Sequence, residues 1–251
     1  MKSLMLILVF GIFSFTLFGQ EAADAFQKAN DLYGDKKYEK AAVIYKELIE
    51  KGYSNSELYY NLGNAYYKMK MIPEAILYYE KAKKADPDDE DIQLNLRMAK
   101  LQTVDKIEQV PKVFYIKWYE SILEHYHSSL FSGIMIVFIW VFFISLAGFL
   151  KFRRPVAKKT LFAVSGISLI VVILSFTLAV QSYEEENTKD EGIIFSTSVY
   201  VKSSPDEEGT NLFILHEGTK AKVLDEVDNW KKIRIANGNV GWVPNGTLEM
   251  I

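Results

Sequence analysis

The stretches Leu130–Leu150 (LFSGIMIVFIWVFFISLAGFL) and Thr160–Val180 (TLFAVSGISLIVVILSFTLAV) decide the organisation of this chain. Neither stretch contains a charged residue or a proline, and each matches the roughly 20 residues that a helix needs to cross about 30 Å of hydrocarbon. We therefore predict two transmembrane helices, at 130–150 and 160–180. The alternative is a hairpin buried in a soluble core, which would need two charge-free runs of nearly spanning length.

A short basic segment, residues 151–159 (KFRRPVAKK), separates the two apolar stretches. It contains no acid, and its cations are Lys151, Arg153, Arg154, Lys158 and Lys159. A short loop with this bias is held on the cytoplasmic side of a membrane by the positive-inside rule. We therefore expect a multi-pass protein of the inner (cytoplasmic) membrane, with both soluble portions outside the cytoplasm, in the periplasm.

The composition fits an anchored protein with two small soluble modules. The 251 residues carry a formal net charge of -3, and residues 181–251 hold thirteen acids against seven bases. An acidic outer module argues against nucleic acid as a partner. The chain has no cysteine, which excludes disulfides, thiol catalysis and zinc sites built from thiolates.

The amino end has the pattern of an export signal. Lys2 precedes an apolar run, Leu4–Phe18, that is short for a span and is followed at once by polar sequence. This pattern predicts a signal peptide over residues 1–19, cleaved after Gly19. A retained third helix is the alternative, and in both cases the sequence from Glu21 onward lies outside the cytoplasm.

Residues 22–89 repeat, as shown by Tyr45 and Tyr79, which align 34 positions apart. The second copy fits the pattern W-x2-L-G-x2-Y…A…F…A…P through Tyr59, Leu62, Gly63, Tyr66, Ala75, Tyr79, Ala82 and Pro87. This copy resembles the tetratricopeptide repeat, and the first copy is a looser version of it. We expect a tetratricopeptide array over residues 20–107, ending in a capping helix over about 91–106.

Repeats of this family bind peptides on a concave face formed by the first helix of each pair. Carried over by repeat position, the resemblance implies a peptide groove lined by Phe26, Asn30, Tyr33, Tyr60, Asn61, Asn64, Tyr67, Leu94, Asn95 and Met98. A row of asparagines can pair with an extended peptide backbone, since each side chain is both donor and acceptor. The alternative is that the asparagines only solvate an unused surface. Phe26 and Asn95 stand where chaperone-binding members carry cations, so we do not expect carboxylate clamping.

The segment before the first span, residues 108–129, is rich in aromatic residues. They are Phe114, Tyr115, Trp118, Tyr119 and Tyr126. Aromatic side chains beside a span favour the headgroup layer, so we expect an interfacial helix or elbow that contacts the lipid bilayer. His125 and His127 point to different sides of a helix, and the chain has no cysteine that could serve as a further metal ligand. We therefore expect no metal site here.

The carboxyl-terminal part changes to an apolar periodicity of two over residues 192–251, after an acidic linker predicted over 181–191. Its most telling segments are VYVKSSP at 199–205, LHEGT at 215–219 and GWV at 241–243. These segments resemble the bacterial SH3 family, which implies a small β-barrel. Its candidate binding surface is Tyr200, Trp230 and Trp242, with the alternative that both tryptophans belong to the core.

The expected fold class is therefore a multidomain α + β membrane protein, with a helical tetratricopeptide array, a transmembrane hairpin and a small SH3-like β-barrel. This order of modules is similar to that of the E-type Bat proteins of the Bacteroides aerotolerance operon. The resemblance implies a non-enzymatic adaptor or scaffold in an envelope complex linked to aerotolerance or stress. It also implies protein partners, namely von Willebrand A-domain Bat proteins and a MoxR-type ATPase system.

Two other classes of function are weighed against the adaptor. A cell-wall sensor would use the SH3 module to hold peptidoglycan peptides. An enzyme is not expected, because the sequence has no phosphate loop and no metal-spaced set of His and Glu. Only His125, His127 and His216 would serve as a base near pH 7. We therefore expect no catalytic residues and no cofactor.

Overall fold

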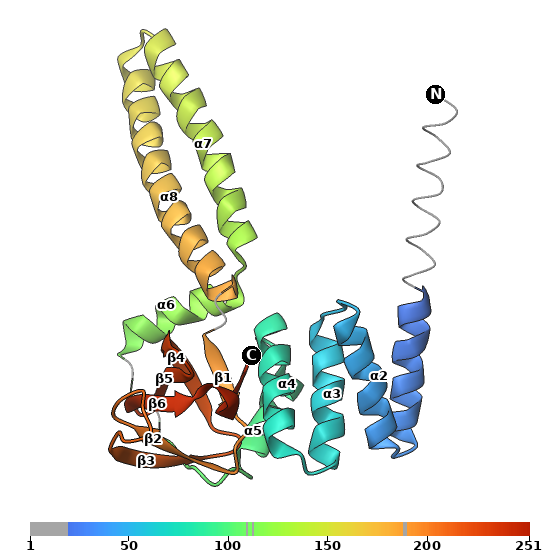
Figure 1. The fold of residues 1–251 in the computed structure, drawn as a ribbon. Helices are drawn as coiled ribbons and strands as arrows, with labels where there is room; N and C mark the ends of the chain where they lie inside the picture. The colour runs from blue at the N-terminus through green and yellow to red at the C-terminus, as the bar shows by residue number, and fades with distance from the viewer. Residues whose placement is uncertain (1–19, 109, 112, 188–189) are drawn as a thin grey trace, which may run out of the picture. The chain divides into compact units, whose positions relative to one another are not determined.

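The computed structural model describes residues 20–108, 110–111, 113–187 and 190–251 (Figure 1). The signal peptide predicted over residues 1–19 lies outside this described part. Two compact units are present, one formed by the chain before Pro111 together with the chain after Thr188, and one formed by the residues between. A helical array, two long apolar helices and an antiparallel sheet confirm the predicted fold class.

The first unit begins with a row of helices that pack side by side (Figure 1). They are the helix over residues 20–34, α2 (Tyr38–Glu50), α3 (Ser56–Lys68), α4 (Ile72–Ala85) and α5 (Glu90–Lys100). The Asn55 side chain caps α3 by accepting a 2.7 Å hydrogen bond from the Leu58 N–H. Pro73 lies in the first turn of α4, where its missing N–H costs no helical hydrogen bond.

The turn inside each helix pair is the same in both copies of the repeat. Lys36 and Lys70, which align with each other, have φ angles of 63° and 65°. In the first copy, the Lys37 N–H donates to the Leu32 carbonyl. In the second copy, the Met71 N–H donates in the same way to the Tyr66 carbonyl. The first copy therefore folds like the second despite its looser sequence, because backbone hydrogen bonds define this turn.

Small residues let the helices of the second pair approach closely. Ala75 is fully buried, and a Cβ added to Gly63 would lie 2.7 Å from the Tyr79 ring carbon Cδ1. The Tyr79 ring itself is held in the core of the array. The direct contact between Gly63 and the Tyr79 ring thus explains why a small residue is needed at this repeat position.

Replacing Gly63 with alanine is expected to lower the free energy of unfolding by up to about 2 kcal/mol. The new methyl group forces the Tyr79 ring to move, and this cost exceeds the roughly 1 kcal/mol that alanine gains over glycine in a helix. Denaturant titration followed by circular dichroism measures the change. Gly34→Ala is the control, because a Cβ there meets nothing within 4 Å. Equal stability of the two variants would contradict the contact.

The capping helix is shorter than predicted. α5 ends at Lys100, whereas the sequence pattern extended the helix to about residue 106. The Lys106 Nζ group folds back and donates to the carbonyls of Leu101 and Thr103, both at 2.8 Å. A lysine that binds the last carbonyls of a helix ends it and complements its dipole. The residues after Lys100 are thereby directed toward the sheet.

The first unit ends in an antiparallel sheet with the strand order β3-β2-β6-β5-β4-β1-β7. The strands are β1 (Glu191–Ile194), β2 (Ser198–Lys202), β3 (Asn211–His216), β4 (Lys220–Val227), β5 (Trp230–Ile235), β6 (Val240–Pro244) and β7 (Leu248–Met250), with the 3-10 turn η1 (Asn245–Thr247) before β7. Alternate residues of the strands, such as Val199 and Val201 or Ile233 and Ile235, form its apolar core.

The acidic linker predicted over residues 181–191 is wrong at both ends, because residues 181–187 belong to helix α8 (Pro155–Asn187). Glu191 is already in β1, where it pairs with Lys220 (Oε2 to Nζ, 2.6 Å). Asp190 pairs with Lys222 (Oδ2 to Nζ, 2.6 Å). These acids are not a solvated spacer, because two lysines of the neighbouring strand β4 neutralise them.

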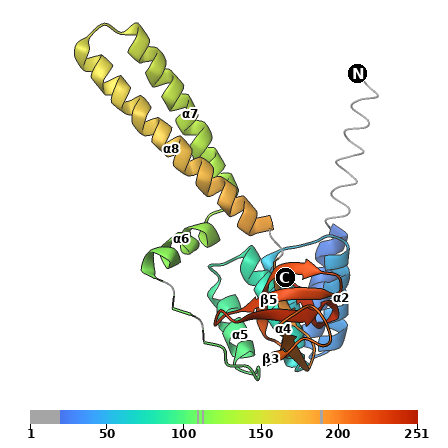
Figure 2. The ribbon, with the colours of Figure 1, turned by 60° about the vertical axis from the view of Figure 1, so that its left-hand side comes forward.

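Strand β1 joins the two modules of the first unit (Figures 1 and 2). Ile193 is fully buried in the core of the helical array, where it packs together with Phe195 and Ile251. Its neighbour Ile194 is fully buried in the core of the sheet. Successive side chains of a strand point to opposite faces, so one strand serves two cores. The array and the sheet are therefore packed together, with a shared apolar boundary.

The second unit contains α6 (Phe114–His125), α7 (Ser128–Lys151) and α8 (Pro155–Asn187). Helices α7 and α8 are both long and apolar enough to cross a membrane. The predicted basic loop 151–159 is shorter in the structure, because only residues 152–154 connect the two helices. Pro155 begins α8, since its fixed φ suits a first helical position.

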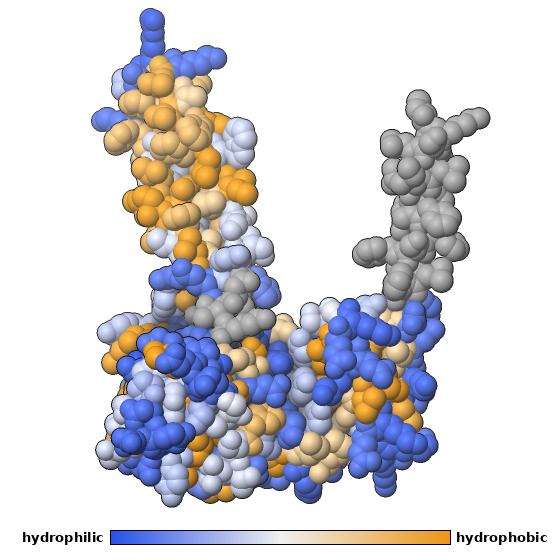
Figure 3. Space-filling view, in the orientation of Figure 1, coloured by the Kyte–Doolittle hydropathy of each residue, from blue (hydrophilic) through white to orange (hydrophobic). Residues whose placement is uncertain are grey.

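The two long helices pack against each other, and the side chains that remain exposed on them are mostly apolar (Figure 3). Small and hydroxylated side chains lie at their contact: Ser145, Ser165, Ser168 and Ser175 are buried. The Ser145 and Ser168 hydroxyls donate to carbonyls of their own helices, at 2.9 and 2.8 Å. Close approach of small residues is the usual way in which helices associate in lipid.

Candidate functional site

The residues predicted to line a groove come from the helix over residues 20–34, from α3 and from α5. Their aromatic members are partly buried by the second helix of each pair. The Phe26 ring packs on Tyr45 with centroids 5.9 Å apart, and Tyr60 packs on Tyr79 at 6.0 Å. One side of each ring thus belongs to the core, which fixes its orientation.

A hydrogen-bonded chain of side chains runs along this face and begins at Asn30. The Asn30 Oδ1 atom accepts from the Tyr45 hydroxyl at 2.6 Å. The same atom accepts from the Asn61 Nδ2 group, in the next repeat, at 3.2 Å. Asn30 therefore joins the two helices of its own repeat and links them to the following repeat.

The same arrangement recurs at Asn64. Its Oδ1 atom accepts from the Tyr79 hydroxyl at 2.7 Å and from the Asn95 Nδ2 group at 3.0 Å. Asn95 also donates to the Tyr60 hydroxyl at 2.8 Å. We call this set the asparagine ladder; its members are Asn30, Tyr45, Asn61, Asn64, Tyr79 and Asn95.

The tyrosines of the asparagine ladder stay protonated. Burial raises the pKa of Tyr45 and of Tyr79 well above the ordinary value, and neighbouring tyrosines raise it further. Both rings are almost completely buried. Each hydroxyl therefore remains a donor to its asparagine, and removal of either asparagine oxygen would leave a buried hydroxyl without its acceptor.

The asparagine ladder changes the expected role of the asparagines. A side-chain oxygen has two lone pairs, and those of Asn30 and Asn64 both accept from other members of the ladder. These two oxygens do not accept from a peptide N–H while the ladder is intact. The asparagine row thus holds the repeats together, and a ligand would meet the tyrosine edges and the apolar side chains beside it.

The groove ends at α5 in an apolar surface. Leu94 and Met98 are 48% and 47% exposed, and Leu101 is 69% exposed. Met98 has the repeat position of Asn30 and Asn64, so the asparagine ladder ends with Asn95. We call Leu94, Met98 and Leu101 the α5 stripe.

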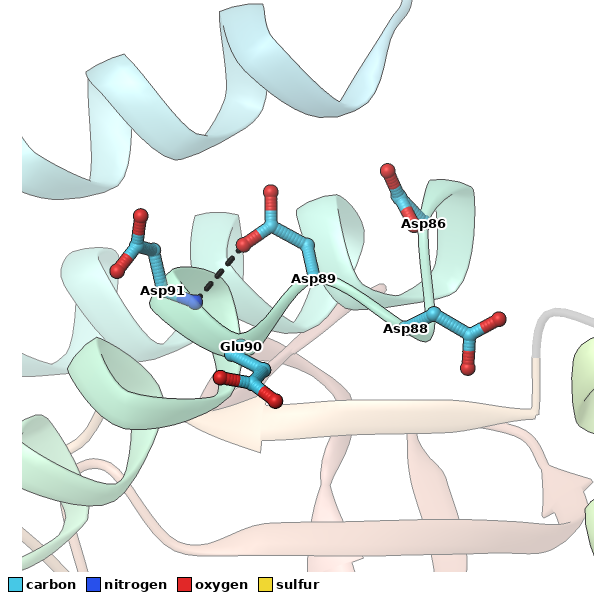
Figure 4. Close-up of a pocket in the computed structure, with 5 residues that line it drawn as sticks. All are labelled: Asp86, Asp88, Asp89, Glu90 and Asp91. Carbon is cyan, nitrogen blue, oxygen red and sulfur yellow. Dashed lines mark hydrogen bonds between the residues drawn. The ribbon is translucent and has the colours of Figure 1, made fainter.

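The start of α5 carries a group of acids beside a shallow surface depression of about 390 Å³ (Figure 4). They are Asp86, Asp88, Asp89, Glu90 and Asp91. Asp89 Oδ1 accepts from the N–H groups of Asp91 at 2.8 Å and Ile92 at 3.1 Å, which caps α5. Acids at this helix end interact favourably with the helix dipole. In the part of the chain that the structure describes, no three His, Asp or Glu side chains approach as metal ligands would.

Two polar contacts that the sequence did not predict lock the array to the sheet. In the first, Glu80 of α4 is only 6% exposed and lies between two lysines. Its Oε1 atom is 2.6 Å from Lys100 Nζ, and its Oε2 atom is 3.0 Å from Lys220 Nζ of β4. Burial alone would raise the pKa of Glu80, but Lys220 and Lys100 outweigh burial and lower it to about 2. The carboxylate is therefore charged at every physiological pH.

In the second contact, Asp105 reaches the turn between β3 and β4. Its Oδ2 atom accepts from the His216 backbone N–H and from the Thr219 hydroxyl, both at 2.7 Å. Its Oδ1 atom lies 2.8 Å from His216 Nδ1. Burial alone would raise the pKa of Asp105, but the hydrogen bonds from His216 and Thr219 lower it. We call these two contacts the interlock; its members are Glu80, Lys100, Lys220, Asp105, His216 and Thr219.

No local sequence signal marks the interlock. Glu80 stands among lysines in a helix whose pattern predicts a solvated acid, and its partner Lys220 is 140 positions away. Asp105 falls in a segment that the sequence pattern had extended as helix. Only the buried position of Glu80 on α4, seen in the structure, distinguishes it from the exposed acids of the array.

The candidate SH3 surface is only partly exposed. Tyr200 is 54% exposed, but Trp230 is 8% exposed and does not belong to an accessible surface. This burial agrees with the alternative of a core position for Trp230. Trp242 is half-buried, and the Lys232 ammonium lies 5.8 Å from the centre of its ring.

Helix α6 carries the predicted aromatic cluster. Phe114 and Trp118 are 83% and 68% exposed, and Tyr115 is also exposed. Only residues 126–127 separate α6 from α7, and the Tyr126 carbonyl accepts from the Ser182 hydroxyl at 3.0 Å. The aromatic helix is thus tied to the base of the two long helices within its own unit.

Two family models match parts of this chain. The model for the tetratricopeptide repeat matches residues 56–89, which contain α3 and α4. The model for the bacterial SH3 domain matches residues 197–249, which contain β2 to β6. Modules of these two kinds are typically non-catalytic and bind proteins, peptides or peptidoglycan. A search of the curated proteins finds no match.

Proposed function

We propose that this protein is a membrane-anchored adaptor that holds partner proteins outside the cytoplasm and has no catalytic role of its own. The observation that carries the proposal is one chain with a tetratricopeptide match, a bacterial SH3 match and two helices of spanning length. The interlock supports it, because it packs the two binding modules together within one compact unit. A partner that contacts both modules would then lose less freedom on binding than with flexibly linked modules.

The proposed partner site is the concave face beside the asparagine ladder. Tyr33, Tyr60 and Tyr67 lie along it, and the ladder holds their helices in a fixed spacing. An extended or helical segment with apolar side chains fits this surface better than an anionic one, since no cation occupies the clamp positions at Phe26 and Asn95. Aromatic residues held by packing are efficient contact residues, because they lose little conformational entropy on binding.

A photocrosslinking amino acid placed at Tyr33 is expected to capture the partner in native membranes. The matched control is Val43, on α2, which is 56% exposed but lies outside the proposed groove. Mass spectrometry identifies the captured proteins. Capture of von Willebrand A-domain membrane proteins or of a MoxR-type ATPase at Tyr33 alone would support an envelope complex of the aerotolerance type. If Val43 captures the same proteins equally well, the groove is not the recognition surface.

The proposed topology has the connection between α7 and α8 in the cytoplasm and both soluble modules in the periplasm. It is supported by Lys151, Arg153 and Arg154 at this connection and by the bacterial SH3 match, since such domains suggest an extracytoplasmic location. A reporter that works only in the cytoplasm is expected to be active when inserted at Pro155 and silent when fused after Ile251. Activity at the carboxyl end would overturn the double-span topology.

A second candidate function is binding of peptidoglycan peptides by the SH3 module. The exposed Tyr200 ring and the Trp242 ring beside Lys232 favour it, because aromatic faces with a nearby cation suit sugar and peptide ligands. Titration of the full chain in detergent with soluble muropeptides tests it. Tyr200→Ala should weaken binding at least tenfold, while Tyr53→Ala, a tyrosine of the array, should not. If the wild-type protein binds no muropeptide, this candidate function is excluded, and the adaptor proposal is not affected.

A further inference from the structure

Helix α6 has an apolar side and a polar side. Its large apolar residues follow one another at helical spacing, so they share one side of the helix. We call this side the α6 aromatic face; its members are Phe114, Tyr115, Trp118, Tyr119 and Ile122. Lys117 and Ser121 lie on the opposite side of the helix, and both are exposed. Three rings of the α6 aromatic face, those of Phe114, Tyr115 and Trp118, are exposed as well.

The carboxyl end of α6 is fixed at the level where both long helices leave their apolar stretches. The Ser182 hydroxyl, which donates to the Tyr126 carbonyl at 3.0 Å, follows just after Val180, the last residue of the charge-free stretch of α8. The Tyr126 ring packs against Phe131, near the start of the charge-free stretch of α7, with ring centroids 6.4 Å apart. In a membrane that α7 and α8 cross, this junction therefore lies in the headgroup layer.

Helix α6 also has the direction of a helix that lies on a membrane. It runs across the end of the α7 and α8 pair and does not continue either helix (Figures 1 and 2). Its short connection to α7, residues 126–127, keeps it close to the end of the pair. A helix that crosses a membrane-spanning pair at this level lies along the membrane surface. An amphipathic helix in this position buries its apolar side at the boundary between headgroups and acyl chains.

The chemistry of the α6 aromatic face fits lipid. Tryptophan and tyrosine rings have an apolar body and a polar tip, so they are favoured in the layer between hydrocarbon and water. The face is also continuous with a surface that lipid must cover, because Leu130, at the start of the apolar stretch of α7, is itself exposed. The face carries no charge, and the polar side has both a cation, Lys117, and an acid, Glu120. Nothing in this arrangement requires an anionic headgroup.

We infer that α6 is an in-plane membrane-binding helix, whose Phe114 and Trp118 rings enter the headgroup layer of the bilayer that α7 and α8 cross. This inference rests on the proposed membrane anchoring and goes beyond the adaptor function, since it assigns a lipid-binding surface outside the two spans. Interfacial aromatic anchors set the tilt and rotation of the spans that they adjoin. Helix α6 therefore also restrains the α7 and α8 pair in the bilayer.

Site-directed spin labelling tests the inference, since the chain has no native cysteine. Single cysteines replace Phe114 or Trp118 on the α6 aromatic face, and Lys117 or Ser121 on the opposite side. Each full chain is labelled and reconstituted into vesicles of phosphatidylethanolamine and phosphatidylglycerol. Oxygen reaches labels in lipid, whereas a nickel chelate reaches labels in water. The ratio of oxygen to nickel collisions is expected to be at least about threefold higher on the aromatic face than on the opposite side.

Two exposed valines serve as controls for these labels. Val137 on α7 is 58% exposed and should be in lipid, and Val43 on α2 is 56% exposed and should be in water. If the Val137 label is in water, the membrane anchoring itself fails. If the Val137 label is in lipid but the labels at Phe114 and Trp118 are in water, only the inference about α6 is overturned. Protection of these two labels from both reagents would also overturn it, because protein would then cover the face.

Quenching of tryptophan fluorescence by brominated lipid gives a second test, which needs no label. A Trp140→Phe protein retains Trp118 together with Trp230 and Trp242 of the sheet. Vesicles that contain phospholipid brominated close to the headgroup should quench part of its emission. The further change Trp118→Phe should abolish this quenching, while circular dichroism checks that the helices remain folded. Emission that is not quenched, or that is quenched equally with and without Trp118, would refute the inference.

Discussion

Replacing Glu80 with glutamine is expected to lower the free energy of unfolding of the first unit by about 3–5 kcal/mol. Glutamine keeps the size of the side chain but removes the charge that faces Lys220 and Lys100. Lys220 is only 29% exposed and would then lose its main buried counter-charge. Removal of one partner of a buried ion pair is costly because the other charge remains desolvated.

The pH dependence provides a sharper test of the same residue. The pKa of Glu80 is about 2 in the folded chain, against 4.5 for an ordinary glutamate. The unfolded chain therefore binds the proton first, and the stabilisation by Glu80, present above about pH 5, is lost as the pH falls toward 2. Urea titrations of the wild type and of Glu80→Gln should converge over this range. Glu50→Gln, at an exposed position on α2, is the control and should follow the wild type. A constant gap between wild type and Glu80→Gln down to pH 2 would contradict the charged interlock.

The second large effect is expected at Ile193. Truncation of this residue to alanine should cost about 2–5 kcal/mol, because its side chain is completely buried and the cavity it leaves cannot fully collapse. The cost should appear in both modules, since a strand of the sheet supplies part of the core of the array. Hydrogen exchange measured by mass spectrometry resolves peptides from α4 and β5 separately. Both should exchange faster in Ile193→Ala.

Val227→Ala is the matched control for Ile193, because Val227 lies on a strand of the same sheet but is 40% exposed. Its exchange should follow the wild type within error in α4 and change little in β5. If Ile193→Ala accelerates exchange in β5 alone, the sheet and the array are energetically independent, and the shared boundary contributes little.

The parts of the fold that follow from local patterns were predictable from the sequence. The 34-residue repeat, the two charge-free stretches and the period-two segment each specify their own element through contacts within about one repeat or one hairpin. The aligned turns at Lys36 and Lys70 show that even the looser copy retains its backbone geometry. Helix ends were less accurate, because Lys106 ends α5 by a contact that only the folded chain makes.

The interlock and the asparagine ladder could not be predicted in the same way. From the sequence, Ile193 is expected to be an ordinary buried residue of a strand. The adjacent residues in the sequence do not indicate that its side chain packs in the core of the helical array. The row of asparagines was visible, but its hydrogen bonds depend on the buried hydroxyls of Tyr45 and Tyr79. Pattern predicts which residues share a face; it does not predict which partner satisfies each polar group.

Strand β1, which contributes to two cores, also imposes an order on the synthesis and folding of this protein. Residues 191–251 leave the ribosome last, about 80 residues after the end of the array, which at 5–20 residues per second is roughly 4–16 s. During that interval the surface around Ile76 that later receives the sheet lacks its cover. Because the two apolar helices lie between these segments in the sequence, the array gains its cover from the sheet only after both helices have been synthesised. A chain that stalls in the hairpin would carry an exposed apolar surface, which is the feature that chaperones and proteases recognise.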